Sequence, residues 1–182
     1  MKKVSQKKVT PIRNKPSRKQ AEEAVKILIK WAGDNPEREG LLETPKRVVN
    51  SYKEFFSGYD SKPEQILSKT FDEVEGYDEM VIVRNITIES HCEHHMVPFI
   101  GIAHIGYIPD KRIVGISKLA RIADVFAKRL QTQEIMTAQI ADTINEVLKP
   151  KGVAVVIDAQ HQCMTTRGTH KTESSTITSR ML

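Results

Sequence analysis

Cysteine is scarce in this sequence, and long apolar runs are missing from it. Only Cys92 and Cys163 occur among the 182 residues, so the disulfide framework of a small secreted domain is excluded. No apolar run is long enough to span a bilayer, and the N-terminus lacks the apolar segment of a secretory signal. We therefore expect a soluble, cytoplasmic protein with reduced thiols. A disulfide between the two cysteines is the least favoured interpretation, and metal binding or burial as free thiols are the alternatives.

Acidic residues are absent from the first 20 positions, which carry eight Lys or Arg. The formal net charge of the chain is +5, but residues 21–182 alone carry a net charge of −3, so the folded part is mildly acidic. No aromatic residues are interleaved with the N-terminal charges to stack on bases. We interpret residues 1–17 as a basic, disordered tail, and we expect no nucleic acid and no membrane among the partners.

The length is that of one well-buried domain with a small appendage, and the patterning predicts that appendage as an N-terminal helical region over residues 18–68. Ser17 and Gln20 form a capping-box pattern before apolar residues at helical spacing. Thr44 and Pro45 predict the N-cap and first-turn proline of a second helix. The first helix is predicted to be amphipathic, and the second is predicted to bury Val48, Tyr52, Phe55 and Phe56.

Residues 69–182 carry the patterns of an α+β domain. Period-two alternation and short β-rich or buried-type apolar runs predict strands, and apolar residues at helical spacing predict two long helices. The order of elements predicts an antiparallel sheet with a pair of long helices on one face. The predicted strands cover residues 80–89, 99–108, 153–160 and 174–181, and the predicted helices cover residues 117–130, capped by Ser117, and 134–148.

Both cysteines stand in short clusters that also hold four of the six histidines. The spacing of Cys92 and His95 lets one turn of chain offer two ligands to an ion such as zinc, and Cys163 can supply a third. Three protein ligands leave the fourth tetrahedral position to water, which is the pattern of catalytic zinc. A fourth ligand from His94 or His161 would instead close the site as a structural one. These two histidines are also candidates for proton transfer, and simple hydrogen bonding is the alternative.

Charged residues near the ends of the predicted elements are weaker candidates. Lys118, Arg121 and Arg167 are suited to binding an anionic substrate, and solvated surface charge is the alternative interpretation. Glu134 begins a predicted helix, where an acid is stabilised by the helix dipole without any further function.

Six separated motifs, in order, resemble the GTP cyclohydrolase I family, and together they cover nearly all of residues 18–181. The motifs are GDNPEREGL over 33–41, TPKRV over 44–48, CEHHMVPF over 92–99, ISKLAR over 116–121, RLQTQE over 129–134 and HQCMTTRG over 161–168.

The resemblance implies a fold, an assembly and a reaction. The fold is the tunnelling fold, in which the sheets of several subunits form a barrel, with residues 69–182 as the catalytic domain. The assembly is a homo-oligomer, a decamer of two pentamers, with active sites at subunit interfaces. The implied enzyme is a zinc-dependent cyclic amidine hydrolase that converts GTP and water to 7,8-dihydroneopterin triphosphate and formate. In this reaction zinc-bound hydroxide attacks guanine C8, and the product enters tetrahydrofolate biosynthesis.

The resemblance also implies a role for each site residue. Zinc is held by Cys92, His95 and Cys163, and the acid–base pair is His94 and His161. Guanine is anchored by Glu134 with help from Gln133, and the triphosphate or ribose is bound by Ser117, Lys118, Arg121 and Arg167. A structural-zinc, nucleotide-binding module without turnover is the alternative. Deazaguanine nitrile reduction, a related chemistry on this fold, needs a cysteine nucleophile, and two ligand cysteines leave no thiol for it.

Overall fold

The computed structural model describes residues 12, 14–71 and 77–182. The chain forms two compact units that divide between Ser57 and Gly58. The boundary expected between residues 68 and 69 stays a prediction. Most of the tail predicted over residues 1–17 lies outside the described residues.

The N-terminal unit is helical, as predicted. Ser17 Oγ accepts a hydrogen bond from Gln20 N at 3.3 Å, and Gln20 Oε1 accepts one from Ser17 N at 2.8 Å, which confirms the capping box. The second helix is capped by Glu43, so the prediction of Thr44 as N-cap was wrong by one residue. The elements are α1 (Arg18–Trp31), the 3₁₀ helix η1 (Glu39–Leu41) and α2 (Thr44–Phe55).

The expected burial of apolar residues in α2 was wrong for Tyr52 and Phe55, and Val48 and Phe56 are only half-buried. In α1, all of whose residues the structure describes, none is buried, and Trp31 is 88% exposed. Tyr52 and Phe55 of α2 are also exposed, at 39% and 38%. Two helices bury only the strip along which they pack, so a unit of this size leaves apolar side chains in contact with solvent.

The C-terminal unit contains the sheet. Its first residues belong to the 3₁₀ helix η2 (Ser57–Asp60), which begins at the division between the units. Its helices are α3 (Pro63–Leu67), α4 (Ile116–Ala127), α5 (Gln133–Leu148) and α6 (Gln162–Thr165). Its strands are β1 (Thr70–Phe71), β2 (Val81–Cys92), β3 (Pro98–Ile108), β4 (Ile113–Val114), β5 (Leu130–Gln131), β6 (Gly152–His161) and β7 (Thr176–Met181).

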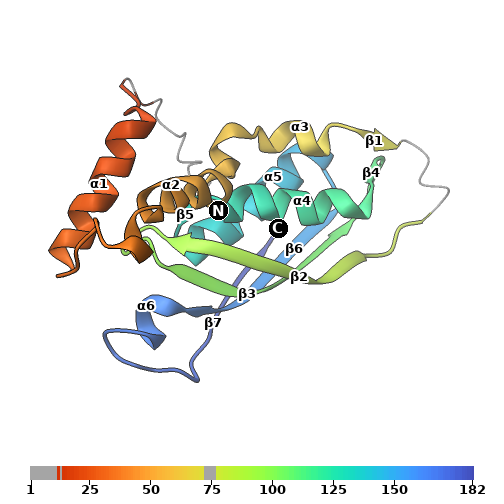
Figure 1. Ribbon diagram of the computed structural model, residues 1–182. Coiled ribbons are helices and arrows are strands. Elements are labelled where there is room, and N and C mark those ends of the chain that lie inside the picture. The colour runs from red at the N-terminus through yellow and green to blue at the C-terminus, as the bar shows by residue number, and fades with distance from the viewer. Residues whose placement is uncertain (1–11, 13, 72–76) are drawn as a thin grey trace. The chain divides into compact units, whose positions relative to one another are not determined.

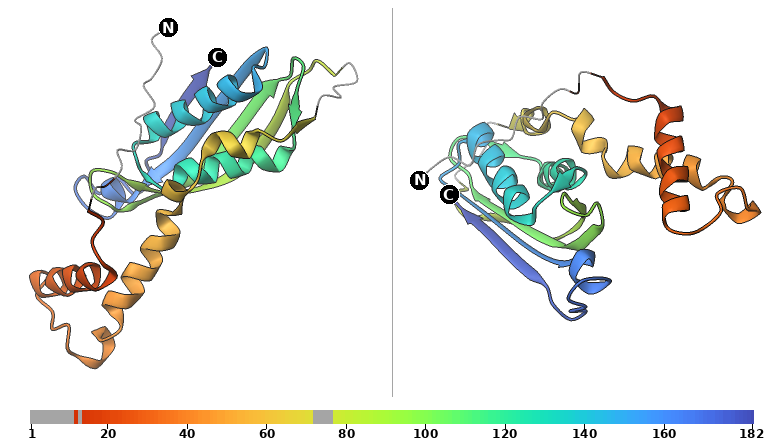
Figure 2. Two further views of the ribbon diagram at one scale, coloured as in Figure 1. Left: turned by 90° about the horizontal axis from the view of Figure 1, so that it is seen from above. Right: turned by 90° about the vertical axis from the view of Figure 1, so that its left-hand side faces the viewer.

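The strand order of the main sheet is β5-β2-β3-β6-β7, and α4 and α5 lie side by side on one of its faces (Figures 1 and 2). This confirms the α+β prediction of an antiparallel sheet covered by a pair of long helices. One strand departs from it: the two-residue strand β5 runs parallel to β2. The start of α4 also differs from the prediction of Ser117 as its cap, because Gly115 is the N-cap and Ser117 lies in the first turn.

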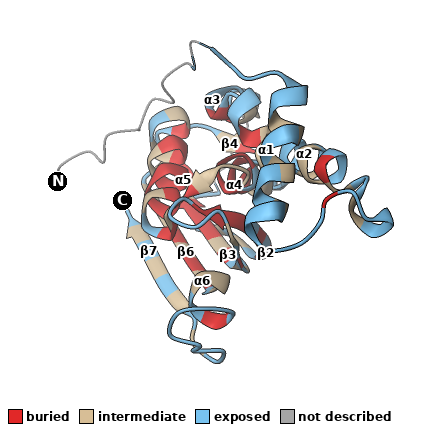
Figure 3. Ribbon diagram, turned by 60° about the vertical axis from the view of Figure 1, so that its left-hand side comes forward, coloured by how far each residue is buried: buried red, intermediate tan, exposed pale blue. Residues whose placement is uncertain are grey.

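The core lies between the sheet and the helix pair (Figure 3). Alternate residues of β3 and β6 point into it, and α4 and α5 supply the opposite side, with each fully buried large side chain stabilising the fold by about 1.5–3 kcal/mol. Among the described residues, no helix is both long and apolar enough to cross a membrane.

Candidate active site

The turn after β2 brings two candidate ligands together. Cys92 N donates to Val97 O at 2.9 Å, and Met96 N donates to Cys92 O at 2.8 Å, so the turn closes on Cys92. Met96 takes a left-handed backbone conformation, with φ at 55°. This closure places His95 Nδ1 3.8 Å from Cys92 Sγ.

The parallel strand β5 holds this turn from the other side. Glu93 N donates to Gln131 O at 2.9 Å, directly after the Cys92–Gln131 pair. The buried Gln131 side chain donates in turn to Phe126 O at 2.9 Å and to Gln139 Oε1 at 3.0 Å. The position of the turn is therefore fixed by both long helices.

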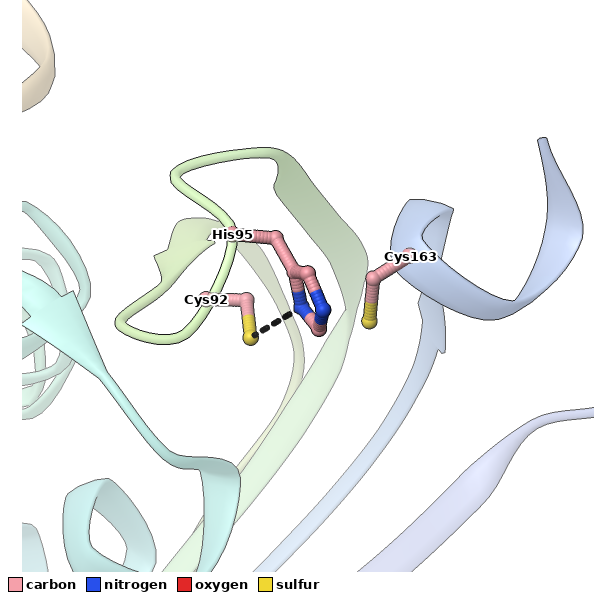
Figure 4. A group of neighbouring side chains, drawn as sticks. All are labelled: Cys92, His95 and Cys163. Atoms are coloured by element: carbon pink, nitrogen blue, oxygen red, sulfur yellow. Dashed lines mark hydrogen bonds between the residues drawn. The ribbon is translucent and has the colours of Figure 1, made fainter. Parts of the chain in front are cut away.

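The third candidate ligand comes from the other end of the domain sequence. β6 ends at His161, which pairs with Phe99 at the start of β3, and α6 then directs Cys163 toward the turn after β2. Figure 4 shows the side chains of Cys92, His95 and Cys163 converging from these two segments. Their ligand atoms all lie within 4.8 Å of one another, and the three residues are buried, exposed and half-buried respectively.

Two thiols and one imidazole are a donor set that suits zinc. Burial raises the pKa of the Cys163 thiol, and the neighbouring Cys92 raises it further, while Arg167 opposes the shift. Two thiolates at this distance need a compensating positive charge, which a divalent cation supplies. The residues present therefore fit the predicted metal.

Neither His94 nor His161 belongs to this ligand group, which contains three residues within the described part of the chain. His94 Nδ1 lies 3.6 Å from Cys92 Sγ, and the residue is exposed. His161 Nε2 lies 2.8 Å from Gln133 Oε1 instead. The closed, structural site with a fourth protein ligand is therefore not favoured.

The imidazole of His161 is held on two sides. Its ring stacks on the fully buried ring of Phe99, with centroids 4.6 Å apart and planes 8° apart. Burial lowers the pKa of His161 below that of an exposed imidazole, and the nearby Glu134 partly offsets this. The ring is therefore favoured in its neutral form at neutral pH.

Gln133 and Glu134 begin α5, behind the N-cap Thr132. The Glu134 carboxylate is exposed and close enough to His161 to influence its pKa. Gln133 is 1% exposed, and its amide bonds within the chain to Ile157 O, Thr176 O and His161. Glu134 can therefore accept hydrogen bonds from a ligand, whereas the Gln133 amide is already bonded within the chain.

The remaining predicted binding residues divide into two places. Arg167 is exposed and near enough to Cys163 to lower the pKa of its thiol. Ser117 and Lys118 lie in the first turn of α4, beside β4, and Arg121 lies midway along the helix, whereas the metal turn lies near its other end, beside β5 (Figure 1). The 12 residues of α4 span about 18 Å, at roughly 1.5 Å per residue.

Sequence reasoning gave no role to three residues that build this site. Phe99 lies within the CEHHMVPF motif, but only the strand register shows that it faces His161. Gln131 belongs to a strand too short to have a periodic pattern. Arg129 donates to Gly58 O at 3.0 Å and so holds the segment that leads into β5.

The family model and the similar relatives agree on one family. The GTP cyclohydrolase I family model matches residues 21–182. A GTP cyclohydrolase 1 of Maricaulis maris (strain MCS10) is 62% identical over 167 residues, which cover 92% of this chain and 82% of the relative. A GTP cyclohydrolase 1 of Brucella suis (strain ATCC 23445 / NCTC 10510) is 59% identical over 175 residues, which cover 96% and 82%. Among solved structures, the apo crystal structure of the archaeosine synthase QueF-Like has a TM-score of 0.44 at 12% identity, covering 56% of this chain and 91% of that one.

Proposed function

Because this chain belongs to the GTP cyclohydrolase I family, we propose that it converts GTP and water to 7,8-dihydroneopterin triphosphate and formate. This is the first step of tetrahydrofolate biosynthesis. The observation that carries the proposal is the group formed by Cys92, His95 and Cys163, three ligand atoms within 4.8 Å from two distant parts of the chain. A structural-zinc module without turnover would need a fourth protein ligand, and the described residues offer none in that group.

The three ligands would hold a zinc ion and leave one position for a small molecule. When bound, zinc supplies Lewis-acid chemistry and makes nucleophilic water available near neutral pH. The chain's own part in the reaction is proton transfer and binding. His161, favoured as a neutral imidazole by burial, is suited to accept a proton, and the exposed His94 is suited to exchange one with solvent.

Guanine recognition falls to Glu134. Its exposed carboxylate at the start of α5 can accept hydrogen bonds from the ring N–H and the exocyclic amine of guanine. The Gln133 side chain is already bonded inside the chain, so its predicted help to Glu134 has less support from its contacts. Arg167, next to Cys163, is suited to bind the ribose or triphosphate.

Ser117, Lys118 and Arg121 would serve the active site of another subunit. Ser117 and Lys118 lie at the end of α4 that is remote from the metal turn of their own chain, and Arg121 lies midway along the helix (Figure 1). The open face of the sheet also carries exposed apolar side chains, among them Ile100, Ile102 and Ile177, and such patches are typical of subunit interfaces. Both features support a homo-oligomer with active sites at subunit interfaces. We propose a decamer of two pentamers, in which the sheets of several subunits form the barrel of the tunnelling fold.

The cytoplasmic location is part of the same proposal. Cys92 and Cys163 are free thiols, the state that a reducing compartment maintains.

Incubation of the purified protein with GTP tests the function directly. We expect release of formate and a pterin that becomes fluorescent after oxidation. Cys163→Ser and His95→Ala should lose bound zinc and formate release together, because each removes a ligand. His170→Ala, an exposed histidine in the loop after α6, is the control and should retain both. Full zinc content in the two ligand variants would contradict the ligand assignment. If the wild type binds zinc but releases no formate, the proposed activity is wrong and the structural-zinc module is the function that remains.

A further inference from the structure

The contacts of the Gln133 amide fix its orientation. Its Nε2 lies 3.0 Å from Ile157 O and 2.8 Å from Thr176 O, both backbone carbonyl oxygens. Carbonyl oxygens only accept hydrogen bonds, so the amide nitrogen has to face them and its two N–H groups are used there. The amide oxygen is then the atom that faces His161. This follows from the chemistry of the neighbours, without any need to observe hydrogen atoms.

The orientation of the amide determines which nitrogen of His161 carries a proton. Gln133 Oε1 can only accept, and His161 Nε2 lies 2.8 Å from it, so Nε2 has to donate. A neutral imidazole carries a single N–H. The lone pair of the ring therefore belongs to Nδ1, which no group of the described residues engages in a hydrogen bond.

Stacking alone does not select this state. Phe99 fixes the plane of the imidazole, with an interplanar angle of 8°, but a half-turn of the ring about its Cβ–Cγ bond leaves that plane unchanged. The half-turn would place a ring C–H against Gln133 Oε1 and lose the hydrogen bond. Gln133 therefore distinguishes the two ring orientations that Phe99 allows.

Gln133 is itself firmly held. It is 1% exposed, and Thr137 Oγ1 donates to its backbone oxygen at 2.7 Å. Its amide joins α5 to β6 at Ile157 and to β7 at Thr176, so three elements determine where Oε1 lies. A glutamate at this position would oppose two carbonyl oxygens with carboxylate oxygens, which explains why an amide is needed.

We propose that Gln133 is a positioning residue: its amide oxygen fixes the ring orientation and the tautomer of His161, with the N–H on Nε2 and the lone pair on Nδ1. Nδ1 is then the ring atom left available for catalysis. The catalytic consequence rests on the proposed function, whereas the protonation state of the ring does not.

Nitrogen-15 NMR of the zinc-loaded, histidine-labelled protein tests the ring state, with the His161 signals identified through His161→Asn. We expect protonated Nε2 and unprotonated Nδ1 in the wild type, and loss of this single form in Gln133→Met, which keeps side-chain length and removes the amide. Thr143→Val is the matched control, because it removes another buried hydrogen-bonding group of α5, one whose bond lies within the helix, and it should leave the His161 signals unchanged. A wild-type ring protonated at Nδ1 would overturn the proposal even if Gln133→Met does not fold.

Steady-state kinetics of formate release separate positioning from substrate binding. We expect Gln133→Met to lower kcat about 10- to 100-fold, less than the roughly 10²- to 10⁴-fold that an acid–base group itself contributes, and to change the KM for GTP by less than about 3-fold. A raised KM with kcat unchanged would mean that Gln133 binds guanine, and the positioning role would be wrong. If the wild type releases no formate, the proposed function fails, and the NMR result still decides the ring state.

Discussion

Met96 carries backbone strain at the point where the metal turn closes. Its φ of 55° lies in the left-handed region, which costs a residue with a side chain about 1–2 kcal/mol. The hydrogen bonds from Met96 N to Cys92 O and from Cys92 N to Val97 O hold it there. The turn that presents His94 and His95 is thus kept in place at some cost to stability, as is common at functional sites.

We predict that Met96→Gly raises the unfolding free energy of the zinc-free protein by up to ~1 kcal/mol. Relief of the left-handed conformation is partly offset by the larger entropy of glycine in the unfolded chain. Met96→Val should lower the unfolding free energy by about 1 kcal/mol or more, because a β-branched residue tolerates positive φ poorly. Urea denaturation measures both.

Met164→Gly provides the comparison for this pair. Met164 is exposed in the short helix α6, where glycine has no positive φ to relieve and should cost about 1 kcal/mol. A loss in Met96→Gly as large as that in Met164→Gly would show that the φ of Met96 is not a source of strain.

Gln133 and Glu134 show what the sequence can and cannot reveal about the site. Both belong to the RLQTQE motif, and the resemblance assigns both to guanine. Consecutive residues on a helix point about 100° apart, so one carboxamide enters the core while the next carboxylate reaches solvent. Which of the two faces inward depends on how α5 packs on the sheet, and no local pattern contains that information.

At the scale of elements, β3 and β6 approach each other at Gly101 too closely to admit a side chain. A Cβ atom there would lie 2.0 Å from Asp158 O and 2.5 Å from Ala159 Cα, both backbone atoms of β6. The β3–β6 pairing continues from this point to Phe99 and His161, so the same contact supports the active site.

We predict that Gly101→Ala lowers the unfolding free energy by about 3 kcal/mol or more, since the two strands have to separate to admit the methyl group. Gly152→Ala is the control on the same pair of strands. Its Cβ would meet Leu182 O at 3.4 Å, an ordinary contact, so we expect a change of no more than about 1 kcal/mol. Equal effects in the two variants by chemical denaturation would refute the steric explanation.

The long, periodic elements of this fold were predictable, and the short ones were not. Alternation placed β2 and β7, apolar β-rich runs placed β3 and β6, and helical spacing placed α4 and α5, because each element is long enough to show its pattern. The strand β5 has two residues and pairs in parallel, so it has no local signal, although it fixes the metal turn through Gln131. The starts of α2 and α4 were misplaced because Thr44 and Ser117 are good cap residues that the chain uses inside the first turn.

At the scale of the whole molecule, the ligand group connects parts of the chain that are far apart in sequence. Cys92 and His95 follow β2, whereas Cys163 follows β6, after both long helices. The sequence predicted the ligands from residue type and spacing, but their approach depends on the β2–β3–β6 order of the sheet. A bound ion therefore favours the folded sheet over any state in which these strands separate.

We predict that zinc raises the melting temperature of the protein and that a chelator reverses the increase. An ion that binds only the folded state adds about 2.7 kcal/mol when its free concentration is 100 times its dissociation constant. Thermal unfolding measured with and without zinc should show this shift in the wild type and in the control His170→Ala. In Cys163→Ser the shift should be largely lost, because the link between α6 and the turn after β2 is broken while Cys92 and His95 remain as a local pair. A shift of wild-type size in Cys163→Ser would mean that zinc binds one local turn and does not join the two segments.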